Sequence, residues 1–356
     1  MNNDRIQEIL DLMEEARLDY FLISDPQSIA YCTGYYNDPH ERMFVFMISK
    51  HGNHTLFMND LFYLEHDLDV NIVWHKDGQD AIQTIVDEMH FPGRIGIDKN
   101  WASHFLLDLM KKLPDAKYIN ASPCVDLVRM KKDLQEQVLM IESSKINDAV
   151  MEEIIPFIQE GVTEKQLAKK LDELFFNHHS TCYGAIVAFG KNAADPHHEN
   201  DDTPLRKGDC VLIDMGCVYK GYCSDMTRTF FYEGILEEEI KVYEIVKKAN
   251  EAAEAMIKPG VKLSDIDKCA RKVISDEGYG KYFTHRLGHF IGRDVHEYGD
   301  VSSVNEMEVE EGMIFSIEPG IYFEGNFGVR VEDLVMVTKD RCQVLNSFTK
   351  DIYIIY

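Results

Sequence analysis

The feature that most constrains this chain is an acidic residue inside one of its most apolar segments. Residues 211–216 read Val-Leu-Ile-Asp-Met-Gly, so Asp214 interrupts a stretch that otherwise suits the interior of a β-sheet. A lone ionised carboxylate in such surroundings costs several kcal/mol unless it is paired or bound to a cation. The fold must therefore give Asp214 a partner.

A second acidic residue lies on the strand expected to return from this segment. The chain turns near residues 219–221 and returns through residues 222–230, with Asp214 and Asp225 symmetric about the bond between residues 219 and 220. In a hairpin these residues are near-opposite neighbours, with Cβ atoms roughly 5 Å apart. Two ionised acids at that separation repel each other strongly without a metal ion.

The same arrangement recurs farther along the chain. Residues 313–318 form a predicted strand, residues 328–335 form its return, and Glu318 and Glu332 are symmetric about Gly325. Each hairpin thus offers one opposed acid pair. Four converging carboxylates with one imidazole would hold two divalent cations about 3.5–4 Å apart, the spacing of two-metal hydrolytic sites.

A histidine-rich segment offers the imidazole. Residues 284–297 contain His285, His289 and His296, interleaved with glycines. This pattern is unlike a helix interior and is typical of a chain that approaches a site closely.

The length and the periodicity of the sequence predict two domains. A chain of 356 residues exceeds the roughly 250–300 residues at which single hydrophobic cores stop growing. The first third alternates a helical pattern with short apolar strands, which predicts a small α/β domain. Its predicted elements are a helix at residues 6–16 and strands at residues 20–23, 44–48, 55–57 and 95–98. We therefore expect one domain at residues 1–128 and a second at residues 129–356.

The second domain contains an internal repeat. A long helix is predicted from about residue 134 to residue 157, and Thr163 with Gln166 forms a capping box for a helix that follows. A similar pair recurs later, where we expect Ser264 and Asp267 to cap the second helix. Because β-rich sequence follows each pair, the domain is predicted to be an α+β fold built from two facing copies.

Composition excludes several classes of function. The chain has 37 basic and 62 acidic residues, and its net charge of −25 repels nucleic acids and anionic membranes. No apolar run approaches the ~20 residues of a membrane helix, and the start lacks the layout of a secretion signal, so we expect a cytoplasmic protein. The 8 cysteines form no C-x-x-C pair, which favours reduced, mostly buried thiols.

Taken together, the motifs resemble those of the pita-bread metallopeptidases that act at proline, namely prolidase and aminopeptidase P, with methionine aminopeptidase and creatinase as more distant relatives. The N-terminal third resembles the creatinase-type domain of the same enzymes. The resemblance implies an α/β creatinase-type domain followed by an α+β pita-bread domain with an internal two-fold repeat. The residues that carry it are 213–216, 224–229, 285–289, 316–320 and 329–333.

The resemblance also implies a set of metal ligands. Asp214 and Asp225 would supply the first acid pair, with Asp225 bridging both ions. His289 and Glu318 would complete one site, and Glu332 would bridge again. Ligation mainly by oxygen favours a hard ion, so we expect Mn²⁺, with Co²⁺ or Zn²⁺ as alternatives.

The implied reaction is hydrolysis of a peptide bond whose nitrogen belongs to proline. Glu318 would take the proton of a metal-activated water molecule, and His197, His285 and His296 would lie near the substrate as hydrogen-bond donors. Arg330 precedes Glu332 by two positions on the same strand face, which suits it to fixing the metal carboxylates. His198, His178 and His179 have no motif support and are expected to face solvent.

The sequence leaves the substrate open. Phe290 and Arg293 depart from the usual prolidase pattern, and Arg293 is a candidate for binding the free carboxylate of a dipeptide. An Xaa-Pro dipeptidase is favoured over an aminopeptidase P that accepts longer peptides, and over a non-catalytic peptide- or protein-binding module. The resemblance implies a homodimer, and residues 38–42 form a loop that is a candidate for reaching the site of a neighbouring subunit, or else a solvated charge cluster.

Overall fold

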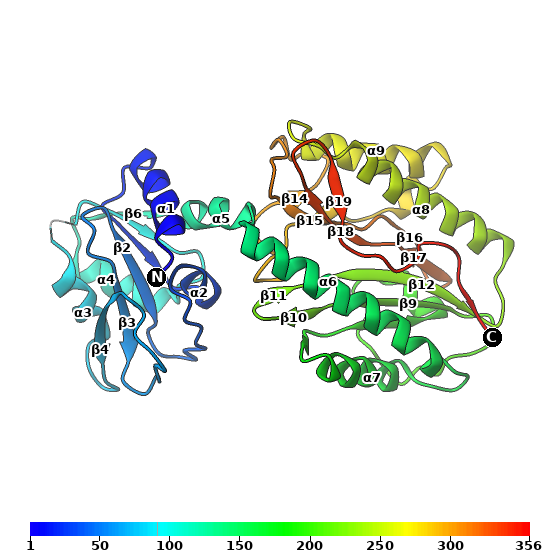
Figure 1. The fold of residues 1–356 in the computed structure, drawn as a ribbon, viewed down its shortest axis with the longest axis horizontal. Helices are drawn as coiled ribbons and strands as arrows, with labels where there is room; N and C mark the ends of the chain where they lie inside the picture. The colour runs from blue at the N-terminus through cyan, green and yellow to red at the C-terminus, as the bar shows by residue number, and fades with distance from the viewer. Residues whose placement is uncertain (91) are drawn as a thin grey trace. The chain divides into compact units, whose positions relative to one another are not determined.

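The computed structural model describes residues 1–90 and 92–356. The chain divides into two compact units, Met1–Arg129 and Met130–Tyr356 (Figure 1). In the part of the chain that is described, no helix combines the length and the apolar character needed to cross a membrane. All eight cysteines are free, five of them buried and three half-buried.

The first unit is an α/β domain around a mixed sheet with the strand order β4-β3-β2-β1-β5-β6. Alternate residues of β1 pack on opposite faces, as the pleat requires. Phe21 packs with the cluster that includes α1 and α2, whereas Leu22 packs with the cluster that includes α3 and α4. The strands are β1 (Tyr20–Ile23), β2 (Val45–Ser49), β3 (Thr55–Asn59), β4 (Asn71–His75), β5 (Arg94–Ile97) and β6 (Lys117–Asn120). The helices are α1 (Asn3–Glu15), α2 (Pro26–Thr33), α3 (Ala81–Glu88), α4 (Ser103–Lys112) and α5 (Ser122–Met130).

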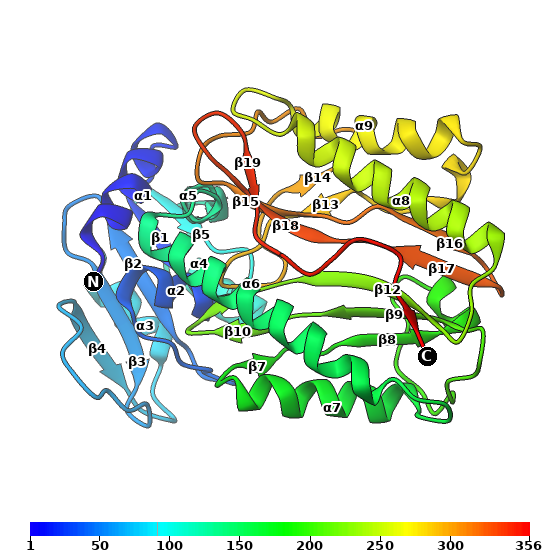
Figure 2. The same cartoon turned by 45° about the vertical axis from the view of Figure 1, so that its right-hand side comes forward.

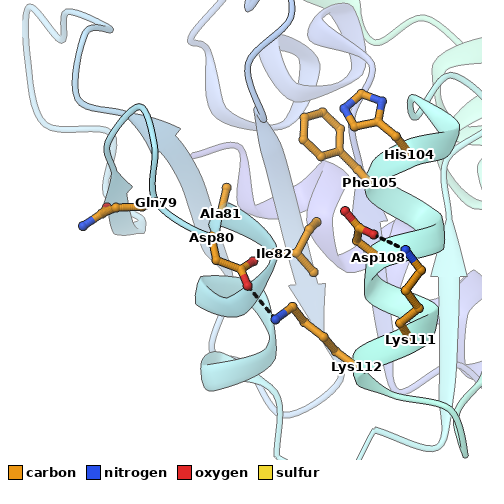
Figure 3. Close-up of a pocket in the computed structure, with 9 residues that line it drawn as sticks. All are labelled: Gln79, Asp80, Ala81, Ile82, His104, Phe105, Asp108, Lys111 and Lys112. Carbon is orange, nitrogen blue, oxygen red and sulfur yellow. Dashed lines mark hydrogen bonds and ion pairs between the residues drawn. The ribbon is translucent and has the colours of Figure 1, made fainter.

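An open hollow of about 540 Å³ lies beside α3 and α4 in this unit (Figure 3). Two lysines in its wall are already paired with acids. Lys112 Nζ lies 2.6 Å from Asp80 Oδ2, and Lys111 Nζ lies 2.7 Å from Asp108 Oδ1. The hollow therefore offers a neutralised rather than a cationic surface.

The second unit consists of two helix–helix–strand copies, which confirms the predicted repeat. Figure 2 shows strands between α7 and the α8–α9 pair, with α6 crossing the same strands. The first copy contains α6 (Leu134–Ile154), α7 (Glu164–Asn177), β7 (Thr181–Cys182), β8 (Ile186–Phe189), β9 (Cys210–Met215), β10 (Cys217–Tyr219), β11 (Tyr222–Cys223) and β12 (Met226–Tyr232). The second contains α8 (Glu237–Met256), α9 (Leu263–Asp276), β13 (Gly288–His289), β14 (Asp300–Val301), β15 (Ile314–Ile317), β16 (Gly320–Phe323), β17 (Phe327–Arg330), β18 (Asp333–Val337) and β19 (Cys342–Val344).

Further short elements complete this unit. The strand β20 (Ile354–Ile355) pairs with β12 in the sheet β20-β12-β9-β8. Short 3-10 helices lie at Ile155–Phe157, Gly190–Ala194 and Gly280–Tyr282.

One predicted helix start is confirmed and one is wrong. The capping box of Thr163 and Gln166 opens α7 as expected. By contrast, α9 begins at Leu263 after Lys262, and Ser264 lies inside the helix with its hydroxyl donating to Glu306 Oε1 at 3.0 Å. The backbone N–H of Leu263 donates to the Met307 carbonyl, so a strand-like contact sets this helix start in place of a side-chain cap.

Candidate metal centre

The first acid pair is carried by an antiparallel hairpin whose register differs from the predicted one. Asp214 on β9 pairs with Thr227 on β12, so Asp225 is a diagonal neighbour and not the near-opposite one expected. Lys220 and Gly221 occupy the turn with φ of 49° and 82°, as a tight two-residue hairpin turn requires. The turn lies within the predicted residues 219–221, but the strand pairing is centred one residue later than the opposed pairing of Asp214 and Asp225 assumed. Because side chains alternate with a period of two, the offset leaves both acids on the same face.

The second acid pair lies where the sequence predicted. Gly320 pairs with Arg330, and Ile317 pairs with Asp333 in the same register. Glu318 and Glu332 fall between these pairs, at the interruption that divides the returning strand into β17 and β18. The two glutamates are therefore opposite each other across the hairpin.

The two hairpins open into one cavity of about 650 Å³. It contains both acid pairs, four histidines and two arginines. Its lining residues are Tyr183, Gly184, Ile186, Pro196, His197, Asp214, Asp225, His285, Arg286, His289, Val295, His296, Glu318, Arg330 and Glu332.

The innermost part of the cavity has the donor set of a divalent-cation site. One ligand atom from each of Asp225, His289 and Glu332 lies within 4.8 Å of the others, and all three residues are buried. His289 Nε2 lies 3.6 Å from Asp225 Oδ2 and 3.7 Å from Glu318 Oε1. Its Nδ1 lies 3.2 Å from the carbonyl oxygen of Phe290, which can only accept, so the proton is on Nδ1 and the Nε2 lone pair faces the acids.

Burial and mutual repulsion make this cluster unfavourable without a cation. Burial, followed by the charge of Asp214, raises the pKa of Asp225 well above its usual range. Burial and the charge of Asp225 do the same to the pKa of Glu332. Burial raises the pKa of Glu318 to about 7 and lowers that of His289 to about 3. Bound cations would attract the ionised carboxylates and offset their burial and mutual repulsion, so the residues present fit a divalent metal.

Arg330 is the buried cation that holds the cluster. Its Nη2 donates to Asp214 Oδ2 at 2.6 Å, and its Nε donates to Thr227 Oγ1 at 3.1 Å. The Thr227 hydroxyl donates in turn to Glu332 Oε2 at 2.6 Å. Arg330 therefore connects the two hairpins, in the place where the sequence predicted a residue that fixes the acids.

The predicted histidines lie along the cavity in different surroundings. His285 Nδ1 lies 2.7 Å from the Arg286 carbonyl oxygen, and its Nε2 lies 2.9 Å from the Tyr322 hydroxyl, so both ring nitrogens are engaged. Burial, then the charge of Arg330, lowers the His285 pKa to about 4, which keeps the ring neutral. The ring of His296 packs edge-on against that of His289, with centroids 4.2 Å apart.

Three other expectations meet a different arrangement. The guanidinium of Arg293 lies 5.4 Å from the Tyr222 ring centroid, and the described residues that line the cavity include Arg286 and Arg330 but not Arg293. The ring of Phe290 is fully buried against Phe315, so it packs in the core. His198 was expected to face solvent, but its side chain is only 13% exposed because Nε2 is bound to Glu164 at 2.7 Å.

Sequence reasoning missed two tyrosines. The Tyr183 hydroxyl donates to the Ser224 carbonyl at 2.8 Å beside Asp225, and Tyr322 lies between Arg330 and His285. A signal for Tyr183 exists in the motif glycine Gly216, where a Cβ atom would lie 2.0 Å from the tyrosine oxygen. A glycine in an apolar strand often marks such a close approach.

Comparison with known proteins identifies the class. Residues 138–339 match the model of metallopeptidase family M24, and residues 5–131 match that of the creatinase/prolidase N-terminal domain. The chain therefore belongs to metallopeptidase family M24, and its second unit is the pita-bread fold that the motifs predicted.

Individual relatives are similar over nearly the whole chain. An uncharacterized peptidase of Staphylococcus aureus is 34% identical over 355 residues, covering 97% of this chain and 99% of the relative. A dipeptidase of Pyrococcus horikoshii OT3 superposes with a TM-score of 0.92 at 35% identity, covering 98% of this chain and 99% of that one. A prolidase of Thermococcus sibiricus has a TM-score of 0.94 at 32% identity, with 99% of both chains covered.

Proposed function

We propose that this protein is a dinuclear metal-dependent dipeptidase that cleaves the bond before proline in Xaa-Pro dipeptides. The observation that supports this most directly is the convergence of two acid pairs and His289 in one cavity. The likeness to proteins described as a dipeptidase and a prolidase supports the same substrate class. A non-catalytic binding module would have no use for a complete and electrostatically unfavourable set of ligands.

Five residues would hold the metal ions, with Mn²⁺ as the proposed ion and Co²⁺ or Zn²⁺ as alternatives. They are Asp214, Asp225, His289, Glu318 and Glu332. Asp225, His289 and Glu332 would form the inner part of the site, because their ligand atoms lie within 4.8 Å of one another and all three residues are buried. When bound, two divalent cations lower the pKa of a water molecule and polarise a substrate carbonyl.

The side chains around the ligands would handle the protons. We assign Glu318 to accept the proton of the attacking water and to pass it to the proline nitrogen that leaves. His197 and His296 are exposed and line the cavity, and we assign them to donate hydrogen bonds to the reacting carbonyl. His285 is assigned a positioning role, because its ring nitrogens are occupied by the Arg286 carbonyl and the Tyr322 hydroxyl.

Arg286 is proposed to bind the free carboxylate of the dipeptide. It lines the cavity and is exposed, and within residues 1–90 and 92–356 its guanidinium has no hydrogen bond or ion pair. Its charge lies close enough to lower the pKa of His296, after the larger effect of burial. A guanidinium binds a carboxylate in a bidentate way. In a longer peptide this carboxylate would lie farther from the scissile bond, which favours a dipeptidase over an aminopeptidase P.

The decisive experiment compares dipeptide and tripeptide substrates. The protein is stripped with a chelator, reloaded with Mn²⁺, Co²⁺ or Zn²⁺, and assayed on Met-Pro and Met-Pro-Ala. We expect faster hydrolysis of Met-Pro, and loss of hydrolysis in Asp225→Asn. Arg286→Ala should raise KM for Met-Pro about tenfold, with Arg293→Ala as the matched control. Preference for the tripeptide would indicate aminopeptidase P, and no hydrolysis at all would overturn the enzymatic proposal.

We also propose a cytoplasmic homodimer with no nucleic acid or membrane partner. The loop at residues 38–42 stays a candidate for contact with a second subunit. Its Arg42 is anchored within its own unit, since Nε and Nη2 donate to Asp77 at 3.0 and 2.9 Å. Sedimentation of the wild type and of a variant with this loop neutralised would test the contact.

A further inference from the structure

A buried carboxylate at the start of α7 has no role in the metal centre. Glu164 has an exposed fraction of 0%, and its ion-pair partner among the described residues is a histidine, with no lysine or arginine in contact. Such a group costs several kcal/mol unless hydrogen bonds compensate for the lost water. The hydrogen bonds of Glu164 therefore indicate its role in the structure.

Both oxygens of Glu164 accept two hydrogen bonds each, all from residues 189–201, which are the last residue of β8 and the loop that follows it. Oε1 accepts from the backbone N–H of Phe189 and from Asn192 Nδ2, both at 2.9 Å. Oε2 accepts from His198 Nε2 at 2.7 Å and from the backbone N–H of Asp201 at 3.0 Å. One carboxylate thus fastens the beginning and the end of the same loop.

Residues between the two ends of the loop that Glu164 binds line the cavity. Pro196 and His197 line it, and His197 directly precedes His198. The backbone N–H of His197 donates to Asp195 Oδ1 at 3.0 Å, and that of His198 donates to the Asp195 carbonyl at 3.2 Å. With this tight turn fixed, holding His198 against Glu164 determines where His197 points.

The other side of the loop is fixed by backbone packing. A Cβ atom at Gly328 on β17 would lie 1.9 Å from the Ala193 carbonyl oxygen. The loop therefore lies directly against the strand that carries Arg330, and this contact fixes its position at Ala193.

We propose that Glu164 and His198 form a clamp that positions His197 for the reaction, and this inference rests on the proposed hydrolase function. A second metal site is the competing interpretation, because ligand atoms of Glu164, His198 and Asp201 lie within 4.8 Å of one another. The carboxylate oxygens of Glu164 already accept four N–H donors, including the proton of His198 Nε2. A cation would have to displace these bonds, so the arrangement is that of a clamp.

A double-mutant cycle on the Mn²⁺-loaded protein tests the clamp. His198→Ala should lower kcat/KM for Met-Pro about 10- to 100-fold, as expected when a reacting group is misplaced by about 1 Å. The double variant with His197→Ala should be no slower than His197→Ala alone, because the clamp acts through that ring. His178→Ala is the matched control, since His178 forms a similar 2.9 Å pair with Glu153 away from the cavity lining.

The clamp would be refuted if the losses in kcat/KM of His198→Ala and His197→Ala multiply in the double variant. Wild-type kinetics in His198→Ala would also refute it. Metal content and the melting temperature, measured on each variant, separate misplacement from unfolding, and Glu164→Gln provides a second route to the same loss. If the wild type hydrolyses neither peptide, the proposed function fails while the clamp is still measured by ¹⁵N-histidine NMR. The ring signal of His197 should then shift or broaden in His198→Ala, and an unchanged signal would refute the clamp.

Discussion

Replacing Asp225 by asparagine should make the metal-free protein more stable while abolishing its proposed activity. Asp225 and Glu332 place ligand oxygens within 4.8 Å of each other in a buried site. Two unit charges at that distance repel by about 3 kcal/mol at an effective dielectric constant of about 20. Asparagine keeps the shape of the side chain and removes this repulsion.

The gain in stability of Asp225→Asn over the wild type should depend on pH, and the pKa of Asp225 determines its direction. Because burial and the charge of Asp214 raise this pKa in the folded state, the folded protein holds a proton that the unfolded chain has released. The wild type therefore loses stability as pH rises through this window. Since protonation relieves part of the repulsion, we expect a gain of about 1–2 kcal/mol at pH 8, or roughly 2–8 °C in melting temperature, and almost none at pH 4.

The assay is thermal unfolding followed by circular dichroism, in excess EDTA and again with Mn²⁺. Glu324→Gln is the matched control, because Glu324 is exposed in the turn of the second hairpin. Mn²⁺ should raise the melting temperature of the wild type and of this control, but much less that of Asp225→Asn. The reasoning is refuted if Asp225→Asn is less stable than the wild type in EDTA at pH 8, or if Mn²⁺ stabilises both equally.

Three other perturbations have defined outcomes. Chelation should lower the unfolding free energy of the wild type, since a ligand at a hundred times its Kd contributes about 2.7 kcal/mol, and titration with Mn²⁺ during melting measures the recovery. Glu254→Gln should stabilise the protein at pH 8 more than at pH 5, as measured by urea denaturation. Burial and then the charge of Asp333 raise the Glu254 pKa to about 7, so ionisation of this residue lowers the stability of the wild type as pH rises. A loss of stability in the variant at pH 8 would show that the ion pair with Lys350, 2.7 Å away, outweighs the cost of burial. Gly288→Ala should abolish Mn²⁺ binding measured by calorimetry, because the new Cβ atom would lie 1.9 Å from the Ser316 carbonyl oxygen, next to His289. Normal Mn²⁺ binding by this variant would show that β13 can shift to make room.

The sequence predicted the acid hairpins because their signal is local. Gly325 marked the turn of the second hairpin, and its register followed correctly. In the first hairpin the turn lies within the predicted residues 219–221, but it includes Lys220 at φ 49°, a conformation that lysine rarely adopts, so the predicted pairing was one residue off. The period of two still placed Asp214 and Asp225 on one face.

Residues that depend on packing between distant segments could not be predicted. Tyr183 meets the cavity because the two copies of the repeat face each other, and Tyr322 was missed because its partners His285 and Arg330 are 37 and 8 residues away in the sequence. In the first unit, the central strands were found from their apolar runs. The edge strands β4 and β6 were missed; they are half-exposed, and their apolar runs are only two or three residues long.

The division of the proposed ligands between two copies of the repeat has a consequence for the order in which the site is assembled during synthesis. Neither copy alone presents more than one acid pair, and the histidine is supplied only by the second copy. A growing polypeptide that has completed its first hairpin therefore carries no working centre. The proposed hydrolytic activity can therefore arise only after synthesis has passed Glu332, the last of the proposed ligands.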